Sequence, residues 1–500
     1  MKDVTTEDGI ALWSTRAGTE EKHVPWGWLA LLTALAVLLR GIGLNAGLWY
    51  DEILTMVEGV RDPLFQIVTV FPGNNQHTLF SVLAHLSISA FGEHPWSLRL
   101  PALMFGAATV PVLYLFARQF ATRREALLGC LLLTTAYHHV WFSQNARGYS
   151  ALACLTLLSS WLLLRVLRHG RTSDAVWYGV AAALGVYAHL TMVFLVVSHA
   201  ILCAVAAGLA GRDAPMWRRG RVVTTAIVLA AAFTLLLYSP VMLDVKQFFV
   251  DRPVQGVAAT PSWAARELIR GLQIGLGAGL GALAAAVLFA AGLWSYLRQS
   301  LFVVGLFVLP GVVTVGAAVA LGRPLYPRFV FFLIGFGLLI AVRGALEIGQ
   351  WFGRSRAHVA GAGLVVAMAA VSVVALIPNY RLPKQDFEAA LRFVEAQRTG
   401  DDVIVTVGQT TRVYREFYHR GWESAPSLEQ FQSIRARGQR VWVVHTLDRY
   451  IEGRTPDLMR MLRAECVVQQ VFHGTVGDGD VTVCVAPPVN NEHRATTTAP

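Results

Sequence analysis

The chain has few charged residues for its length. Only 15% of its 500 residues are Asp, Glu, Lys or Arg, whereas soluble globular chains carry about 25%. This deficit excludes an ordinary soluble enzyme, a disordered chain and a nucleic-acid-binding protein of the usual kind. Hydrophobic residues make up 55% of the chain and its mean hydropathy is +0.49. Such a composition is typical of a polytopic membrane protein.

Cysteine and short catalytic motifs are also scarce. The five cysteines do not form a disulfide framework, and no CxxC, HExxH or Walker A pattern is present, so no motif predicts a metal or nucleotide site. Cys466 and Cys484 lie on the last two predicted strands. If those strands pair, an oxidising compartment would permit a disulfide; two free buried thiols are the equal alternative.

Long apolar runs predict an α-helical polytopic membrane protein with about eleven transmembrane helices, because each run is long enough to cross a bilayer. The apolar segment 77–92 is only about 16 residues long, which is short for a span. We interpret it as a re-entrant or interfacial helix within a first external loop, 45–97. The predicted spans are 26–44, 98–117, 126–143, 149–166, 174–190, 192–210, 222–240, 268–297, 300–321, 326–342 and 357–377.

The distribution of arginines predicts the orientation. Clusters of Arg follow the second, fourth, sixth, eighth and tenth spans, as expected for cytoplasmic loops. An N-terminal tail, 1–25, is therefore expected inside, and an odd number of spans places the C-terminal region outside. The arginines concerned are Arg118, Arg123, Arg124, Arg165, Arg168, Arg171, Arg212, Arg218, Arg219, Arg221, Arg298, Arg343, Arg354 and Arg356.

The pattern changes after the predicted membrane domain, 26–377. From 378 to 489, helical stretches alternate with β-rich runs such as DDVIVTV and QRVWVVHT. This alternation predicts a small extracytoplasmic α/β domain of about 110 residues. The polar tail 490–500 is expected to be disordered.

Two adjacent acids follow the first span in the sequence GLWYDEILT. Asp51 and Glu52 would emerge at the external face of the membrane, where partial desolvation raises the pKa of a carboxylate and makes it a better general base. A solvated helix cap is the alternative of about equal weight, because Asp is a favoured capping residue.

Several cations and hydrogen-bonding side chains are expected on the same external face. An arginine holds a phosphate bidentately and stays charged at any depth, although interface anchoring is the alternative for each cation. Together with the acid pair they suit a lipid-linked phosphate donor, whose leaving phosphate the cations would hold. The cations are Arg147 in FSQNARGYS, Arg328 in GRPLYPRFV and Lys246 in VMLDVKQFF; the candidate substrate contacts are Asn75, His77, Tyr149 and Tyr326.

The order of these motifs resembles a known family. LWYDE, then NNQHTLFSVLAHLSISAFG, LRLPALMFG and FSQNARGYS look like the GT-C glycosyltransferases of glycosyltransferase family 39, the protein O-mannosyltransferase and aminoarabinose-transferase type. The resemblance is strongest over 26–165 and extends to about 340. His77 lacks the prolines of the family's His-Pro-Pro-Leu-like stretch and Asn145 replaces an acid, so the chain resembles a divergent bacterial branch.

The resemblance implies transfer of a sugar from a polyprenyl-phosphate donor to a hydroxyl of a glycolipid, envelope glycan or protein, with inversion. Asp51 would be the general base, Glu52 would support acceptor binding, and Arg328 would contact the lipid phosphate. Localisation in the inner (plasma) membrane is implied, with the lipid bilayer, donor and acceptor as partners and no nucleic acid. No cofactor is certain; a divalent cation remains open, since two adjacent acids make an incomplete ligand set.

Three other functions remain open at this point. A transporter or flippase of lipid-linked sugars would share the basic patches, but it should show charged or broken helices near the middle of the membrane. An oligosaccharide ligase would take a pyrophosphate-linked donor instead. A non-catalytic membrane scaffold would predict that Asp51 is dispensable.

Overall fold

The computed structural model describes residues 23–73, 76–210, 215–248, 266, 269, 280–323, 326–353 and 356–487. These residues form two compact units. The first contains the membrane-type helices. The second combines the described residues from Pro378 onward with a distant stretch, Asn45–Asp62, a grouping that no sequence pattern indicated. Residues 1–22 of the predicted N-terminal tail, the predicted tail 490–500, Asn75 and much of 249–279 lie outside the described residues.

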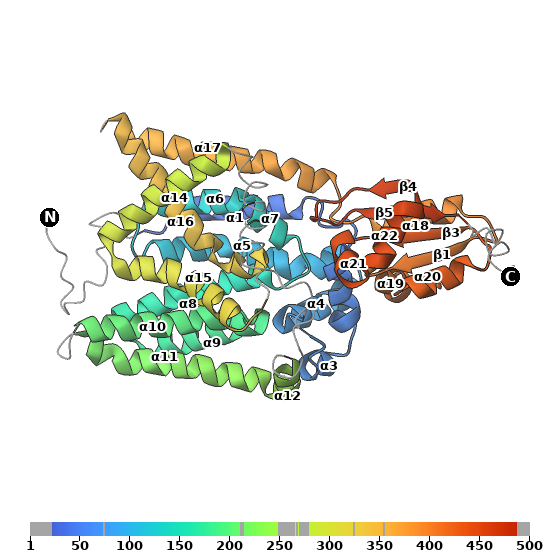
Figure 1. Ribbon diagram of the computed structural model, residues 1–500. Helices are drawn as coiled ribbons and strands as arrows, with labels where there is room; N and C mark the ends of the chain where they lie inside the picture. Colours follow the sequence, from blue (N-terminus) through green and yellow to red (C-terminus); the bar gives the residue numbers. More distant parts are fainter. Residues whose placement is uncertain are drawn as a thin grey trace. The chain divides into compact units, whose positions relative to one another are not determined.

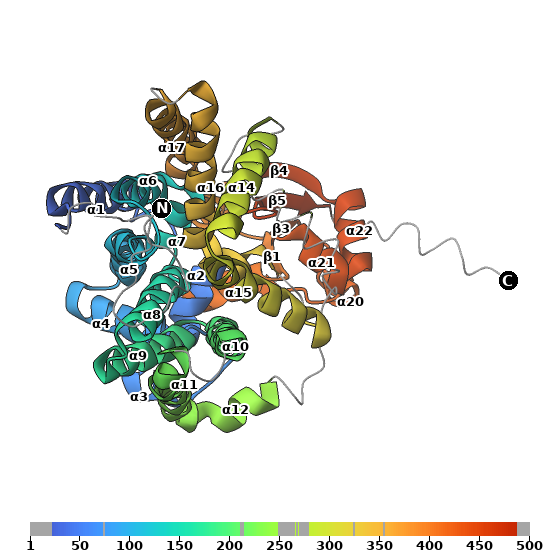
Figure 2. The same ribbon diagram turned by 90° about the vertical axis from the view of Figure 1, so that its left-hand side faces the viewer.

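The first unit is a bundle of apolar helices (Figure 1). Figure 2 looks along the bundle and shows α8 between α5 and α9, against which it packs. The elements are α1 (Trp26–Gly41), α3 (Leu64–Thr69), α4 (Thr78–Phe91), α5 (Pro95–Ala117), α6 (Arg123–Thr135), α7 (Tyr137–Ser143), α8 (Tyr149–His169), α9 (Thr172–Ala188), α10 (Met192–Ala210), α11 (Pro215–Tyr238), the 3-10 turn η2 (Ser239–Val241), α12 (Met242–Lys246), α14 (Leu280–Gln299), α15 (Leu301–Ala320), the 3-10 helix η4 (Pro327–Leu333), α16 (Ile334–Gly349), η5 (Gln350–Phe352) and α17 (Ala357–Arg381).

Eight helices among the described residues are long and apolar enough to cross a membrane. The predicted fold class, a helical polytopic membrane protein with a small C-terminal α/β domain, is confirmed, but the count of eleven spans stays a prediction. Three predicted spans are shorter than required: α1 has 16 residues, α9 has 17, and the span 126–143 is divided into α6 and α7. At about 1.5 Å per residue, such helices fall short of a hydrocarbon core of about 30 Å.

The break between α6 and α7 lies at Ala136, whose backbone leaves the helical region with φ −56° and ψ 118°. The freed amide of Tyr137 donates a hydrogen bond of 3.0 Å to the Ser372 hydroxyl on α17. A side chain from a neighbouring helix thus satisfies a backbone group that an apolar environment would penalise.

Helices α14 and α16 approach each other closely at two glycines. A Cβ atom added to Gly344 would lie 1.8 Å from the Leu288 carbonyl oxygen, and one added to Gly292 would lie 1.8 Å from that of Ile340. The same helix pair buries Arg343, whose Nε donates to Glu125 Oε1 at 2.8 Å. The sequence analysis counted Arg343 in the connection after the tenth span, which was wrong because it lies within α16 and is ion-paired; its cytoplasmic side stays a prediction.

The second unit is built on a five-stranded sheet in the order β2-β1-β3-β5-β4, in which β1 pairs in parallel with β2 and β3, and β5 runs antiparallel to β3 and β4. One face is covered by α20, α21 and α22, and the other by α18 (Figure 1). The elements are α2 (Tyr50–Thr55), the π-helix η1 (Met56–Val60), α18 (Phe387–Gln397), β1 (Val403–Val407), α19 (Thr410–Arg412), the π-helix η6 (Val413–Phe417), β2 (Glu423–Ser424), α20 (Leu428–Arg435), β3 (Val441–His445), α21 (Asp448–Arg454), α22 (Pro456–Glu465), β4 (Val467–Phe472) and β5 (Val481–Ala486).

The two cysteines of this domain form a disulfide. Cys466 precedes β4 and Cys484 lies on the neighbouring strand β5, with their Cα atoms 5.6 Å apart. The alternative of two free thiols is therefore wrong in this structure. The antiparallel register places Val468, two residues after Cys466, opposite Cys484, so the two cysteines are near neighbours on adjacent strands.

The close contact of α14 with α16 generates a prediction. Gly344→Ala should lower the stability of the detergent-solubilised protein by about 1–3 kcal/mol, because the new methyl group meets backbone rather than a flexible side chain. Gly337→Ala is the matched control on the same helix, since nothing lies within 4 Å of its Cβ position. Thermal unfolding compares the two variants; equal midpoints would show that the helices separate without cost.

Candidate active site

The acid pair lies on α2, where its two members have different environments. Glu52 is fully buried, and its Oε2 accepts a hydrogen bond of 3.3 Å from the Trp49 amide, which caps the helix. Asp51 is half-buried, and its carbonyl oxygen accepts from the Thr55 hydroxyl at 2.8 Å. The N-cap position belongs to Trp49. The alternative that Asp51 caps the helix is therefore wrong, and capping is a role of Glu52.

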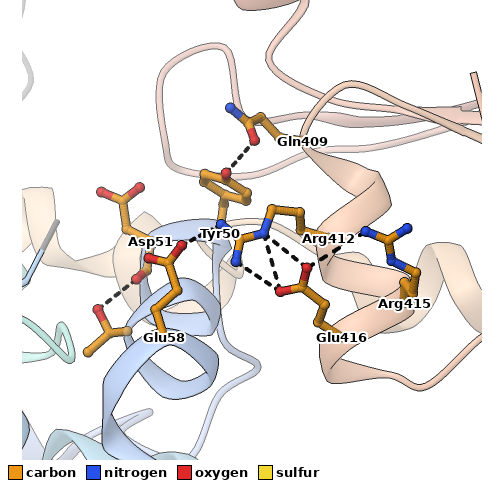
Figure 3. A network of polar contacts seen from close by, with 8 residues as sticks. Tyr50, Asp51, Glu58, Gln409, Arg412, Arg415 and Glu416 are labelled. Carbon is orange, nitrogen blue, oxygen red and sulfur yellow. Dashed lines mark hydrogen bonds and ion pairs between the residues drawn. The ribbon is translucent and has the colours of Figure 1, made fainter. Parts of the chain in front are cut away.

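Residues on either side of Asp51 are held by the C-terminal domain (Figure 3). The Tyr50 amide donates to Gln385 Oε1 at 2.9 Å, and the Tyr50 hydroxyl donates to Gln409 Oε1. Burial raises the pKa of this hydroxyl above its usual range, so it remains a hydrogen-bond donor at neutral pH. Sequence reasoning missed these contacts, because Gln385 and Gln409 lie 335 and 359 residues after Tyr50 in the sequence.

An ion pair holds the other end of the same stretch. Glu58 on η1 pairs with Arg412, which also pairs with Glu416 at 2.9 Å. Burial alone would lower the pKa of Arg412, but its hydrogen bonds to Glu416 and Glu58 raise it above the usual value. The Asp51 side chain leaves α2 in another direction from this ion pair (Figure 3).

A second group of candidate residues lies in the first unit and surrounds two histidines. The ring of His77, which directly precedes α4, lies 5.2 Å from that of Tyr149 and 4.9 Å from that of His189. Tyr149 and His189 are 5.2 Å apart, and the Arg147 guanidinium carbon lies 5.8 Å from the centre of the Tyr149 ring. The structure thus brings together His77, Arg147 and Tyr149 from the sequence analysis and adds His189, which only its polarity in an apolar stretch could have indicated.

Arg328 and Tyr326 reach the same group from the segment before α16. The Arg328 guanidinium carbon lies 4.9 Å from the Tyr326 ring centre and 5.9 Å from that of Phe329. Phe329 in turn contacts His189, with ring centres 5.8 Å apart. We call the set of His77, Arg147, Tyr149, His189 and Arg328 the arginine–histidine cluster; Lys246, exposed on α12, does not join it through any contact of the described residues.

Both imidazoles of the cluster are neutral. Burial is the main cause that lowers the pKa of His77 well below its usual value, and Arg147, His189 and Arg328 lower it further. Burial, together with the two arginines, lowers the pKa of His189 to about 3. A neutral imidazole carries one donor and one acceptor nitrogen, so the hydrogen bonds of each ring identify its tautomer.

The tautomers of the two rings are complementary. His77 Nδ1 lies 3.0 Å from the Ala188 carbonyl oxygen and must donate to it, which makes Nε2 an acceptor. That Nε2 is buried and has no hydrogen-bond partner. His189 Nδ1 accepts from the Thr191 amide at 3.2 Å, so its Nε2 carries a proton. The pair therefore offers one acceptor and one donor, as a substrate hydroxyl requires.

Gly148 shapes this group from the backbone. A Cβ atom at this position would lie 2.5 Å from the Ala188 carbonyl oxygen and 3.1 Å from His77 Cβ. Only glycine leaves room for Ala188 to hold His77, which gives a physical reason for the glycine in the sequence ARGYS.

The residues of the two groups do not fit a protein-bound metal ion. Among the described residues, no three His, Cys, Asp or Glu side chains gather where they could hold one. Glu52 is one member of the predicted acid pair, and its Oε2 already accepts a hydrogen bond from the Trp49 amide. We therefore derive no step through a metal ion.

The chain is similar to one protein family and to several solved structures. Residues 77–243 match the family described as dolichyl-phosphate-mannose-protein mannosyltransferase, and no curated protein matches the chain. The crystal structure of ArnT from Cupriavidus metallidurans in the apo state superposes with a TM-score of 0.55 at 15% identity, covering 92% of this chain and 98% of that chain. The same protein bound to undecaprenyl phosphate gives 0.53 at 16% identity, with coverages of 92% and 98%.

The archaeal oligosaccharyltransferase AglB from Archaeoglobus fulgidus, in complex with an inhibitory peptide and a dolichol-phosphate, superposes with a TM-score of 0.51 at 13% identity. It covers 87% of this chain and 71% of that chain. The chain has the GT-C fold. The family match and this fold together indicate a multi-pass membrane glycosyltransferase, and they confirm the resemblance that the motifs carried.

The neutral state of His77 generates a prediction about pH. In the unfolded protein a histidine has a pKa of about 6.5, whereas the pKa of His77 is lowered in the folded state. The unfolded chain therefore binds a proton that the folded chain does not, so the stabilisation is complete above the unfolded pKa and falls as the pH is lowered. Between pH 7.5 and 5.5 one such group changes stability by up to about 1.4 kcal/mol per pH unit.

His77→Asn should reduce this dependence, because Asn still donates to the Ala188 carbonyl but does not titrate. His358→Asn, at an exposed position, is the control. Thermal midpoints at several pH values provide the measurement. An unchanged slope in His77→Asn would mean that His77 is protonated in the folded protein.

Proposed function

We propose that the chain transfers a sugar from a polyprenyl-phosphate donor to a hydroxyl of a glycolipid, an envelope glycan or a protein. The proposed site of transfer is the extracytoplasmic face of the inner membrane, with the N-terminus in the cytoplasm. The arginine–histidine cluster is the observation that carries the proposal. It combines two cations with a buried, neutral, unsatisfied acceptor at His77 Nε2, which suits a phosphate attached to a sugar.

The relatives support the chemical class of the donor. ArnT has been crystallised with undecaprenyl phosphate, and the structure of AglB is known in complex with a dolichol-phosphate; both ligands are polyprenyl phosphates. On this basis we assign Arg147 and Arg328 to the donor phosphate. A more peripheral electrostatic contribution is assigned to Lys246, because it is exposed on α12. His77, Tyr149 and Tyr326 would contact the sugar or phosphate, as would Asn75.

The proposed reaction is a single displacement with inversion. The acceptor oxygen attacks the anomeric carbon, the bond from that carbon to the phosphate oxygen breaks, and the acceptor proton passes to the Asp51 carboxylate. Negative charge grows on the leaving polyprenyl phosphate. Fixed guanidinium groups therefore stabilise the transition state more than the ground state.

The proposal assigns the two acids different roles. Asp51 is half-buried, a setting in which a carboxylate can accept a proton from a bound hydroxyl. Glu52 would support acceptor orientation through the structure of α2 that it caps. A ligase that uses a pyrophosphate-linked donor is the alternative, and the identity of the accumulating lipid in the experiments below decides between the two donors.

Asp51→Asn should abolish transfer. In a strain that lacks the protein, wild type should restore one sugar to an envelope glycan, glycolipid or protein, whereas Asp51→Asn should leave that sugar missing and its phospholipid donor accumulated. Asp62→Asn, in the same stretch of chain, is the matched control and should restore the sugar. Mass spectrometry of glycans and lipids provides the readout.

Full restoration by Asp51→Asn at equal expression would overturn the assignment of Asp51 as base and favour a transporter, a flippase or a scaffold. Accumulation of a pyrophosphate-linked sugar, in place of a monophosphate-linked one, would identify the ligase alternative.

Arg147→Ala and Arg328→Ala should each reduce the transfer rate by about 10²–10³-fold, the usual loss when a group that stabilises transition-state charge is removed. Lysine at either position should restore part of the rate, because it keeps the charge but not the bidentate geometry. Lys246→Ala should cost less than about tenfold. Rates in membranes, measured with the donor identified above, test this order; a larger loss in Lys246→Ala would contradict it.

A further inference from the structure

The chain on both sides of Asp51 is fastened to the C-terminal domain. The backbone and side chain of Tyr50, the preceding residue, bond to Gln385 and Gln409. Glu58, seven positions after Asp51, pairs with Arg412. Three positions further, the Arg61 guanidinium carbon lies 5.2 Å from the centre of the Phe417 ring. Four contacts thus hold a segment, 50–61, that spans α2 and η1.

The fastening lies at a characteristic place on the sheet. Gln409 follows the carboxyl end of β1, and Gln385 Nε2 donates at 3.1 Å to Thr446, which follows the carboxyl end of the parallel strand β3. Open sheets with parallel strands bind their ligands at the carboxyl ends of those strands. Here that edge is occupied by Tyr50, which is 8% exposed. The usual ligand edge of the domain is therefore filled by the chain's own segment.

Several charge-assisted hydrogen bonds hold the Arg412 guanidinium group. Arg412 contacts Glu416 through both Nε and Nη2, at 2.9–3.2 Å, while its Nη1 contacts Glu58. About a third of the Arg412 side chain and a quarter of that of Glu58 are exposed, at 35% and 26%. Several charge-assisted bonds to one planar group fix its orientation more firmly than a single exposed pair does. Loss of the guanidinium would leave two carboxylates facing each other.

We infer that the C-terminal domain is a positioning element for Asp51, in which Arg412 and Gln409 act through Glu58 and Tyr50. This inference rests on the proposed role of Asp51 as general base. A misplacement of about 1 Å in a reacting group can cost about 10²-fold in rate. The domain would thus contribute to catalysis by holding α2, and neither Arg412 nor Gln409 is assigned a contact with substrate.

The test uses the full-length protein with Arg412→Glu and the matched control Arg415→Glu. Arg415 lies on the π-helix η6, which directly follows Arg412, and its side chain is 63% exposed, 3.9 Å from Glu416. Arg412→Glu should lower the transfer rate about 10²-fold, whereas Arg415→Glu should stay within about threefold of wild type. The double variant Glu58→Arg with Arg412→Glu should recover most of the rate, because Arg at position 58 would face Glu at 412 and at 416.

Two further measurements separate positioning from unfolding. Amide hydrogen exchange of 50–61 should accelerate in Arg412→Glu, while β1 and β3 stay as protected as in wild type. Stabilisation of the protein against heat by added undecaprenyl phosphate should be unchanged, because the proposed phosphate contacts are not altered. Tyr50→Phe, which removes only the hydroxyl bonded to Gln409, should show the same pattern more weakly.

The outcomes distinguish this inference from the proposed function. If Asp51→Asn is inactive but Arg412→Glu is as active as Arg415→Glu, or leaves exchange of 50–61 unchanged, positioning by the domain is overturned and the function stands. If β1 and β3 lose protection in Arg412→Glu, the comparison passes to Tyr50→Phe, and full activity with normal exchange there overturns the inference. Full activity of Asp51→Asn instead overturns the proposed function.

Discussion

The Arg412 guanidinium group fastens the segment that carries Asp51 to the C-terminal domain. Arg412 bridges Glu58 and Glu416, and the first of these pairs joins positions 354 residues apart. Helices α2 and η1 together are only 11 residues long. Helices this short are not stable in isolation. The conformation that presents Asp51 therefore depends on tertiary contacts. Because a carboxylate base must be held in a defined orientation, the proposed chemistry depends on that ion pair and on the hydrogen bonds of Tyr50.

The arginine–histidine cluster shows how charge is distributed in the membrane unit. Two arginines beside two imidazoles would repel protonated rings, and burial already disfavours the charged form. Both effects lower the histidine pKa values in the same direction. The positive charge is thus confined to the arginines, which suit a phosphate, while the neutral rings suit hydroxyl groups. Gly148 and the Ala188 carbonyl oxygen fix which nitrogen of His77 is the acceptor.

Much of the fold could be predicted because it depends on local patterns. Apolar runs located most of the helices, and β-rich runs located β1, β3, β4 and β5. What could not be predicted depends on distant residues. The break at Ala136 is stabilised by Ser372, and Arg343 is neutralised by Glu125, at sequence separations of 235 and 218 for the bonds concerned. Counting charges along the chain does not reveal partners that are distant in sequence. For this reason Arg343 was assigned to a loop.

In the candidate site, too, some features could be predicted from residue type and others could not. His77, Arg147, Tyr149 and Arg328 could be selected by residue type, because an apolar chain tolerates few polar groups without a reason. The asymmetry between Asp51 and Glu52 could not, since adjacent acids look equivalent in a sequence. It arises from helix geometry: a glutamate at the third position of a helix can reach back to the amide of the cap residue, whereas its neighbour at the second position points elsewhere. The acid pair therefore comprises one carboxylate that stabilises the helix and a second, half-buried one to which we assign the proton transfer.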